Sequence, residues 1–267
     1  MEQDASYTGL IPEVYERDLG PMLFAVYAEE VAARAKARQP RRILEVAAGT
    51  GIVTEALRRA LPDATIEATD LNQAMIDFAS AKRPKAATRW SRADALALPF
   101  DDGAFDLVVC QFGAMFFPDR IKAFREARRV LAGRGAYIVS LWDGLQANDL
   151  PRVVSEAAMT IFPDDPPLFL RRTPYGHGDP VAIERDLRDA GFSNVAIERI
   201  EKRSRGPTPR AAASGFVEGT PLRFEIEARD ARRLQAVVEA ATLALSQKFG
   251  DGPVDALMAA FVFIAEP

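Results

Sequence analysis

The stretch that decides the fold is Leu44-Glu45-Val46-Ala47-Ala48-Gly49-Thr50-Gly51. An apolar run over 42–47 leads into two closely spaced glycines, and an amphipathic segment follows over 52–60. This order predicts a buried strand, a tight turn and a helix. Glycine permits a sharp turn and close approach of a ligand to the backbone, although a glycine turn after a strand is often only a turn.

The same strand-and-helix unit repeats along the first half of the chain. Strands alternating with helices of this length predict an α/β fold, with a parallel sheet and helices on both faces. After residue 142 many prolines indicate a long irregular connection, which is typical of lids and binding loops. The predicted strands are 42–47, 64–69, 88–92, 105–110, 136–141, 194–201 and 257–265, and the predicted helices are 22–38, 52–60, 72–82, 119–131, 151–161, 180–190, 208–218 and 229–248.

Composition excludes several kinds of site. The net charge of −4 gives no support for a nucleic-acid partner. With one cysteine, Cys110, and one histidine, His177, the chain cannot form an internal disulfide or a zinc site built from several such residues, and we expect no metal. The acidic N-terminus does not resemble a signal peptide and no apolar run is long enough to span a bilayer, so we expect a cytoplasmic protein with no membrane contact.

Asp70 is the second candidate binding residue. It ends the predicted second strand, 19 residues (70 − 51) after Gly51. An acidic residue about 20 residues beyond such a glycine turn accepts hydrogen bonds from both ribose hydroxyls of a nucleotide-like ligand. The alternative is an Asp that caps the next helix. Its position directly after a buried strand favours the ribose interpretation.

The glycine pattern separates two classes of ligand. A dinucleotide-binding turn has a third glycine, whereas this chain has Thr54 at that position. Glu45 precedes Gly49 by four residues, and a carboxylate there repels a pyrophosphate but tolerates a cation. S-adenosylmethionine carries a sulfonium and an ammonium and no phosphate. The sequence therefore favours S-adenosylmethionine over NAD.

The motif E-x-x-x-G-x-G followed by a strand-terminal Asp resembles class I S-adenosylmethionine-dependent methyltransferases. Three further segments resemble the family: 92–100 (RADALALPF), 105–113 (FDLVVCQFG) and 129–135 (RVLAGRG). The resemblance is closest to methylases of the ubiquinone and menaquinone biosynthesis type, and it is firm over about 40–142. It implies a Rossmann-like sheet of seven strands that is mostly parallel, with the last strand antiparallel and with helical and loop insertions.

The resemblance also implies which residues contact S-adenosylmethionine and its product S-adenosylhomocysteine. Glu45, Gly49 and Gly51 would hold the amino-acid end, Asp70 the ribose, Leu71 and Met75 the two sides of the adenine, Asp94 and Ala95 its amino group, and Gln111 the methionine moiety. The full set of expected cofactor-binding residues is Glu45, Ala47, Gly49, Gly51, Asp70, Leu71, Met75, Asp94, Ala95, Gln111 and Phe112.

We expect a single methyltransferase domain over 1–267. Its expected parts are an N-terminal helical segment that covers the site (1–40), a cofactor-binding core (41–142), a lid or substrate insertion (143–180), and a C-terminal completion of the sheet (181–267) with a helical insertion at about 205–250.

Bulky side chains after the strands predict the acceptor pocket. The expected pocket residues are Tyr15, Met115, Phe116, Trp142 and Tyr175. For Tyr15 and Phe116, simple packing is an equally good or better interpretation. His177 is the candidate general base, because its ordinary pKa lies near neutrality, but an exposed loop histidine is the competing interpretation. Cys110 lies in a buried strand and is interpreted as a small apolar residue.

The predicted function is methyl transfer from S-adenosylmethionine to an O, N or C atom of a small aromatic or apolar metabolite, by a protein that could form a homodimer. One alternative is a regulatory or partner module that binds the cofactor without catalysis. The other is a nucleotide-dependent oxidoreductase, which the missing third glycine disfavours.

Overall fold

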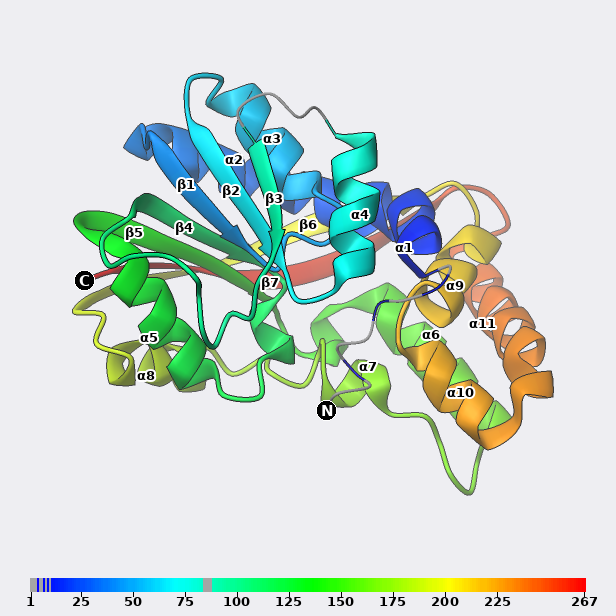
Figure 1. The fold of residues 1–267 in the computed structure, drawn as a ribbon. Helices are drawn as coiled ribbons and strands as arrows, with labels where there is room; N and C mark the ends of the chain where they lie inside the picture. The colour runs from blue at the N-terminus through cyan, green and yellow to red at the C-terminus, as the bar shows by residue number, and fades with distance from the viewer. Residues whose placement is uncertain (1–3, 5–6, 8, 10, 84–87) are drawn as a thin grey trace. The chain divides into compact units, whose positions relative to one another are not determined.

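The computed structural model describes residues 4, 7, 9, 11–83 and 88–267, and it divides the chain into two compact units (Figure 1). Unit 1 comprises Met1–Phe24, Trp142–Gly178 and Glu201–Ala259, and unit 2 comprises Ala25–Leu141, Asp179–Ile200 and Ala260–Pro267. The expectation about a signal peptide concerns the first ten residues, most of which lie outside the described part of the chain. None of the described helices combines the length and apolar character that crossing a bilayer requires.

The sheet has seven strands, as the resemblance implied, and their order is β3-β2-β1-β4-β5-β7-β6. The first five strands in chain order pair in parallel. The last strand runs antiparallel to β6, because Asn194 at the start of β6 binds Glu266 near the chain end, whereas Arg203 binds Asp255. The strands are β1 (Arg42–Val46), β2 (Thr65–Asp70), β3 (Thr88–Arg92), β4 (Phe105–Gln111), β5 (Leu131–Trp142), β6 (Asn194–Gly206) and β7 (Val254–Glu266).

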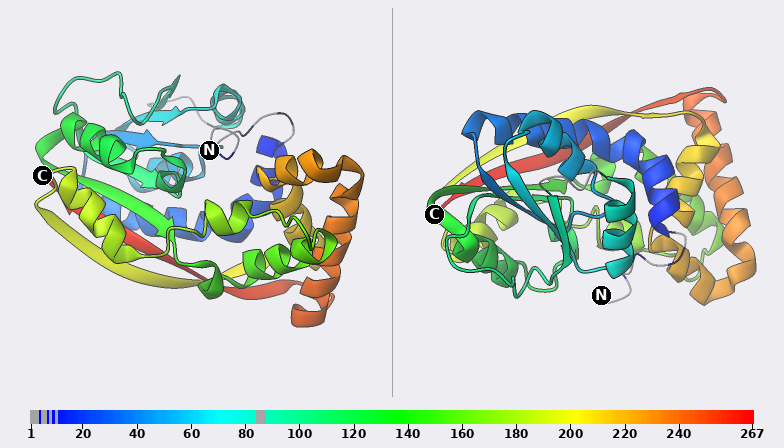
Figure 2. Two further views of the ribbon diagram at one scale, coloured as in Figure 1. Left: turned by 90° about the horizontal axis from the view of Figure 1, so that it is seen from below. Right: turned by 45° about the horizontal axis from the view of Figure 1, so that its top comes forward.

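In unit 2, helices cover both faces of the sheet. Helices α2 and α3 lie on one face, and α5 and α8 lie on the other (Figures 1 and 2). The apolar runs of β1 and β4 are almost wholly buried between these layers, which explains why they lack the alternation of a half-exposed strand. The helices of this unit are α2 (Ala25–Arg38), α3 (Ile52–Ala60), α4 (Gln73–Lys82), α5 (Arg120–Val130) and α8 (Pro180–Asp189).

Two element boundaries in unit 2 differ from those predicted. Helix α4 begins at Gln73, and Asn72 at its N-cap position makes no side-chain cap, because its amide donates to Asp70 instead. Strand β5, predicted over 136–141, includes Gly133 and Gly135. The preceding helix ends at Val130, and β5 begins at Leu131 with an irregular register opposite Phe105 and Leu107. Asp119 caps α5, accepting the Lys122 N–H at 2.9 Å.

Unit 1 is mainly helical. It begins with α1 (Ile11–Val14) and a π-helix over Tyr15–Phe24, where only a helix over 22–38 was predicted. The helix predicted at 229–248 corresponds to α11, which begins only at Leu234. A separate helix over Leu222–Asp230 was not predicted, and a short turn that Asp230 caps lies between the two. The remaining helices of the unit are α6 (Asp149–Ile161), α7 (Phe169–Arg172), α9 (Pro209–Glu218), α10 (Leu222–Asp230) and α11 (Leu234–Phe249).

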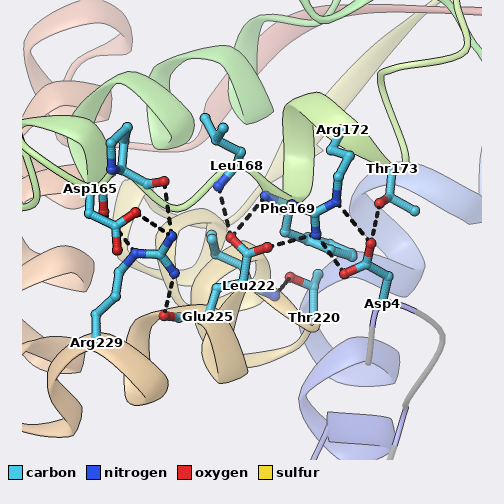
Figure 3. Close-up of polar contacts among 11 residues, drawn as sticks. Asp4, Asp165, Leu168, Phe169, Arg172, Thr173, Thr220, Leu222, Glu225 and Arg229 are labelled. Atoms are coloured by element: carbon cyan, nitrogen blue, oxygen red, sulfur yellow. Dashed lines mark hydrogen bonds and ion pairs between the residues drawn. The ribbon is translucent and has the colours of Figure 1, made fainter. Parts of the chain in front are cut away.

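Charged side chains in unit 1 fix the short helix α7 (Figure 3). Glu225 of α10 accepts the backbone N–H groups of Leu168 and Phe169 through one carboxylate oxygen and the Arg172 guanidinium through the other. Arg172 also binds Asp4, which accepts the Thr173 hydroxyl as well. A helix of four residues is not stable alone. These contacts therefore stabilise α7 and fix the position of its last residue, where the following segment starts.

Asn148 holds the corner that follows β5. It is fully buried, and its amide donates to the carbonyls of Asp143, Gly144 and Ala259 while its oxygen accepts the Ala259 N–H at 3.0 Å. One side chain therefore satisfies backbone groups of two separate segments of unit 1. This accounts for a buried polar residue at the start of α6.

We predict that Asn148→Ala lowers the free energy of unfolding by about 3 kcal/mol, because it leaves several buried backbone groups without partners. Asn194→Ala is the matched control, since Asn194 is exposed and its side chain donates to the exposed Glu266 side chain, and its change should stay within about 0.5 kcal/mol. Urea denaturation measures both. Equal losses in the two variants would contradict the role assigned to Asn148.

Candidate functional site

The loop between β1 and α3 has an unusual backbone. Ala47, Gly49 and Gly51 all have positive φ angles, of 57°, 55° and 83°. The Ala48 N–H donates to the Thr69 carbonyl of β2 at 2.9 Å, and the Gly51 N–H donates back to the Ala48 carbonyl. The loop is therefore attached to the neighbouring strand and coiled tightly at the carboxyl end of β1, where open α/β sheets bind ligands.

The two glycines are required for different reasons. A Cβ on Gly51 would lie 2.6 Å from the Trp90 ring, so this position has no room for a side chain. A Cβ on Gly49 would meet no atom within 4 Å. Gly49 is thus needed for its left-handed conformation, and the space beside it is open to a ligand.

Asp70 lies directly beside this loop. Its Oδ2 accepts the Gly49 N–H at 2.9 Å, and its Oδ1 accepts the Asn72 N–H at 2.8 Å. The side chain is only 8% exposed. Burial raises the pKa of the Asp70 carboxyl, while the backbone hydrogen bonds oppose that effect. Because a carboxylate offers about four acceptor positions, it can still accept hydrogen bonds from a ligand.

Glu45 lies beneath the loop. It is 2% exposed, and its Oε2 accepts the Thr54 hydroxyl at 2.5 Å. Burial raises the pKa of Glu45 to about 8, and the hydrogen bond from Thr54 opposes this only in part. The carboxyl is therefore largely protonated at neutral pH. The argument that a Glu45 carboxylate repels phosphate thus needs correction: burial suppresses the charge on which it relied.

The residues expected around an adenine surround the ends of β2 and β3. Leu71 is 47% exposed, which is unusual for a large apolar side chain, and Met75 of α4 is buried. Asp94 is exposed and accepts the Leu96 N–H at 2.9 Å, which fixes the turn after β3, while Ala95 is buried. Asp70 also contacts this turn, because its carbonyl accepts the Ala93 N–H.

The loop after β4 packs against the glycine loop. A Cβ on Gly113 would overlap the Cβ of Ala47 and lie 2.9 Å from the Cys110 sulfur. Gln111 is half-buried at the end of β4. Phe112 has a positive φ of 56°, and its ring meets Tyr27 edge-on at 5.3 Å. Among the residues expected to contact cofactor, Ala47, Gln111 and Phe112 thus belong to two loops in close contact.

The residues expected to line the acceptor pocket fall into both units. In unit 1, a series of aromatic ring contacts links four side chains. The distances between ring centroids are 4.8 Å from Tyr15 to Phe24, 6.1 Å from Phe24 to Trp142 and 5.6 Å from Trp142 to Tyr175. In unit 2, Met115 is buried and Phe116 is half-buried in the turn after β4. His177 is half-buried and belongs to unit 1.

Sequence reasoning missed three residues at these positions. Phe24 joins the aromatic side chains of unit 1, and Thr54 binds Glu45. Thr50 is 2% exposed, and its hydroxyl has no hydrogen-bond partner in the part of the chain that the structure describes. Thr54 was considered only as the position where a third glycine was absent. That it lies on the helix face toward β1 is a signal that could have identified it.

Comparison with known proteins agrees with this geometry. Residues 44–139 match the model of the methyltransferase domain family. Over 104 residues the chain is 41% identical to a demethylmenaquinone methyltransferase of Thermus thermophilus, a match covering 38% of this chain and 47% of that protein. The chain belongs to the class I S-adenosylmethionine-dependent methyltransferase family.

A second curated relative and a solved structure are also similar to this chain. A malonyl-[acyl-carrier protein] O-methyltransferase of Halorhodospira halophila is 30% identical over 201 residues, covering 64% of this chain and 66% of the relative. The solved structure of phosphoethanolamine N-methyltransferase 2 from Haemonchus contortus shares the fold, with a TM-score of 0.58 and 17% identity over 96% of this chain and 56% of that one. The match thus spans about half to two thirds of the curated relatives' length.

We predict that stability depends on pH through Glu45. Its pKa in the folded protein, about 8, is above the ordinary value of 4.5, so the unfolded state loses this proton first as the pH rises. The free energy of unfolding should therefore fall between about pH 4.5 and 8, relative to that of the Glu45→Gln variant, whose side chain at this position cannot ionise. Thermal denaturation of both proteins across this range measures the difference. A difference that does not change with pH would contradict the buried, protonated state.

We also predict unequal costs for the two glycines. Gly49→Ala should cost about 1–2 kcal/mol, because only the left-handed backbone opposes a side chain there. Gly51→Ala should cost more, because its Cβ also overlaps the Trp90 ring. Denaturant unfolding ranks the two, and a larger loss for Gly49→Ala would be inconsistent with the packing described.

Proposed function

We propose that the protein transfers a methyl group from S-adenosylmethionine to a small acceptor molecule. The observation that carries this proposal is the contact between the glycine loop and the buried Asp70 carboxylate at the carboxyl edge of the sheet. The family of the chain supports the same activity.

The residues at this edge fit the cofactor. There is open space beside Gly49, and the nearby Thr50 hydroxyl is buried without a hydrogen-bond partner among the described residues. Asp70 keeps acceptor positions for hydroxyl donors, and the exposed Leu71 side chain provides apolar surface next to it. Burial raises the pKa of both Glu45 and Asp70, and a cationic ligand nearby would stabilise the ionised forms that burial disfavours.

Each group of residues has a proposed task. The backbone of Gly49 and Gly51, with Glu45 and Ala47 supporting it, holds the amino-acid end of the cofactor. Asp70 accepts hydrogen bonds from the ribose hydroxyls. The groups around the adenine are Leu71 and Met75 on its two sides, with Asp94 and Ala95 at its amino group, and Gln111 and Phe112 line the methionine end.

The cofactor supplies an electrophilic methyl group, so the protein chiefly has to orient the acceptor and exclude water. Tyr15, Trp142 and Tyr175 bring aromatic surface together in unit 1, which supports an aromatic or apolar acceptor. That Met115 and Phe116 line the acceptor pocket stays a prediction from the sequence. The acidic net charge supports a small metabolite over a nucleic acid as acceptor. A cytoplasmic location and a homodimer stay predictions.

Calorimetry tests the proposed cofactor. We expect S-adenosylmethionine and S-adenosylhomocysteine to bind and NAD not to bind. Asp70→Ala should weaken binding of S-adenosylhomocysteine by about 1–3 kcal/mol, because charge-assisted hydrogen bonds are lost. Asp77→Ala is the matched control, since Asp77 is exposed on α4 and its carboxylate accepts from Gln73. This variant should bind S-adenosylhomocysteine as tightly as the unchanged protein. Binding of NAD alone would overturn the proposal.

Turnover separates an enzyme from a module that only binds the cofactor. Radiolabelled S-adenosylmethionine is incubated with a panel of small phenols, amines and carboxylic acids, and transfer of label to an acceptor is measured. We expect transfer to at least one aromatic or apolar member. Tight cofactor binding with no transfer to any of them would favour the non-catalytic alternative.

A further inference from the structure

Two segments of unit 1 lie side by side through two separate contacts. The Trp142 and Tyr175 rings stack with their centroids 5.6 Å apart and their planes 30° apart. Further along, a Cβ on Gly178 would lie 2.7 Å from the Gly144 Cα and 3.1 Å from the Asp143 carbonyl carbon, so the two backbones touch there. Asp143 and His177 each lie between these contacts, Asp143 on one segment and His177 on the other.

The corner that bears Asp143 is rigid. The Asp143 N–H donates to the Ala259 carbonyl at 3.0 Å, and the buried Asn148 amide donates to the Asp143 carbonyl at 3.0 Å. The Asp143 carboxylate is also oriented, because its Oδ1 accepts the Gly144 N–H at 2.6 Å. Both Asp143 and His177 are half-buried. Partial burial lowers the effective dielectric constant, so an electrostatic interaction between the two side chains is stronger than between fully solvated groups.

From this juxtaposition we propose that Asp143 is a positioning residue for His177, holding the imidazole through a hydrogen bond to one ring N–H. The other ring nitrogen is then the proton acceptor, and the carboxylate stabilises the imidazolium that forms. The catalytic part of this inference rests on the proposed methyl transfer, whereas the pairing itself does not.

The proton and electron count for such a step is simple. The acceptor gives one proton from its O–H or N–H bond to the other ring nitrogen of His177 and forms one bond to the methyl carbon. The bond between sulfur and that carbon breaks, and its electron pair stays on sulfur. His177 then releases the proton to water, and Asp143 stays ionised throughout.

Two charged groups close to His177 in sequence, Arg172 and Asp179, bind other partners. The carbonyls of Arg171 and Arg172 contact the backbone at Gly176, and the Arg172 guanidinium is bound by Asp4 and Glu225 (Figure 3). Asp179 follows His177 by two residues, but its carboxylate caps α8 by accepting the Val181 N–H at 3.0 Å. Asp143 is therefore the carboxylate that the neighbouring segment provides.

The composition makes this pairing directly measurable. His177 is the only histidine in the chain, so a protein without a histidine tag gives a single set of imidazole NMR signals. Following them against pH gives the titration midpoint of this one residue without any acceptor. We expect the midpoint to fall by about one pH unit in Asp143→Asn, because a carboxylate beside an imidazole favours its protonated form.

The variant is chosen to leave the fold intact, since the amide oxygen of the substituted side chain can still accept the Gly144 N–H. Asp179→Asn is the comparison, because it removes a carboxylate near His177 in sequence; it should move the midpoint by less than half as much. An unchanged midpoint in Asp143→Asn, or a larger change in Asp179→Asn, would overturn the pairing.

A second measurement needs no variant. The ¹⁵N shifts of the neutral imidazole in the unchanged protein should show one predominant tautomer, because one ring N–H is held by the carboxylate. The tautomer mixture of a free imidazole would contradict the pairing even if Asp143→Asn did not fold.

The role in catalysis has its own readout. Once the turnover assay has identified an acceptor, the rise of kcat/KM with pH should follow the His177 midpoint and should move to lower pH in Asp143→Asn by the same amount. If the NMR midpoint moves in Asp143→Asn but the pH profile of kcat/KM does not, the pairing of Asp143 with His177 is supported and its role in the reaction is contradicted. Failure of the cofactor to bind at all would instead contradict the proposed function.

Discussion

The hydrogen bond from the Gly49 N–H to the Asp70 carboxylate is the interaction on which the candidate site depends. It joins the loop after β1 to the end of β2, two strands already paired in parallel register from Arg42 and Thr65 to Val46 and Thr69. Gly49 can direct its N–H toward Asp70 because a left-handed backbone costs glycine little. The loop and the acidic side chain are thus fixed in place before a ligand binds, which reduces the ordering that binding requires.

Two carboxyl groups, Glu45 and Asp70, are buried at the same place in the candidate site. Desolvation raises the pKa of both Glu45 and Asp70, and the proximity of the two carboxyls raises that of Glu45 further. A positively charged ligand favours the ionised form of each group, so binding of such a ligand is coupled to proton release. The sequence pattern suggested a fixed negative charge at Glu45, whereas burial raises the pKa of this carboxyl and favours its protonated form.

Much of the fold could be predicted from sequence because its signals are local. The run over 42–47, the glycines after it and the Asp119 cap each specify structure within a few residues. Prediction failed where distant contacts decide the outcome. Helix α7 exists because Glu225 and Asp4 bind its two ends, and β5 begins at Leu131 because it pairs there with Phe105. At the site, the spacing of Gly51 and Asp70 identified the loop and the carboxylate, but the partnership of Glu45 with Thr54 depends on how α3 packs on β1.

The most direct test of the central claim is a crystal structure of the protein with S-adenosylhomocysteine. The account predicts that the adenosyl group lies across the carboxyl ends of β1 and β2, with both ribose hydroxyls within hydrogen-bonding distance of the Asp70 carboxylate. A bound ligand elsewhere, or an Asp70 carboxylate that points away from the ribose, would contradict it.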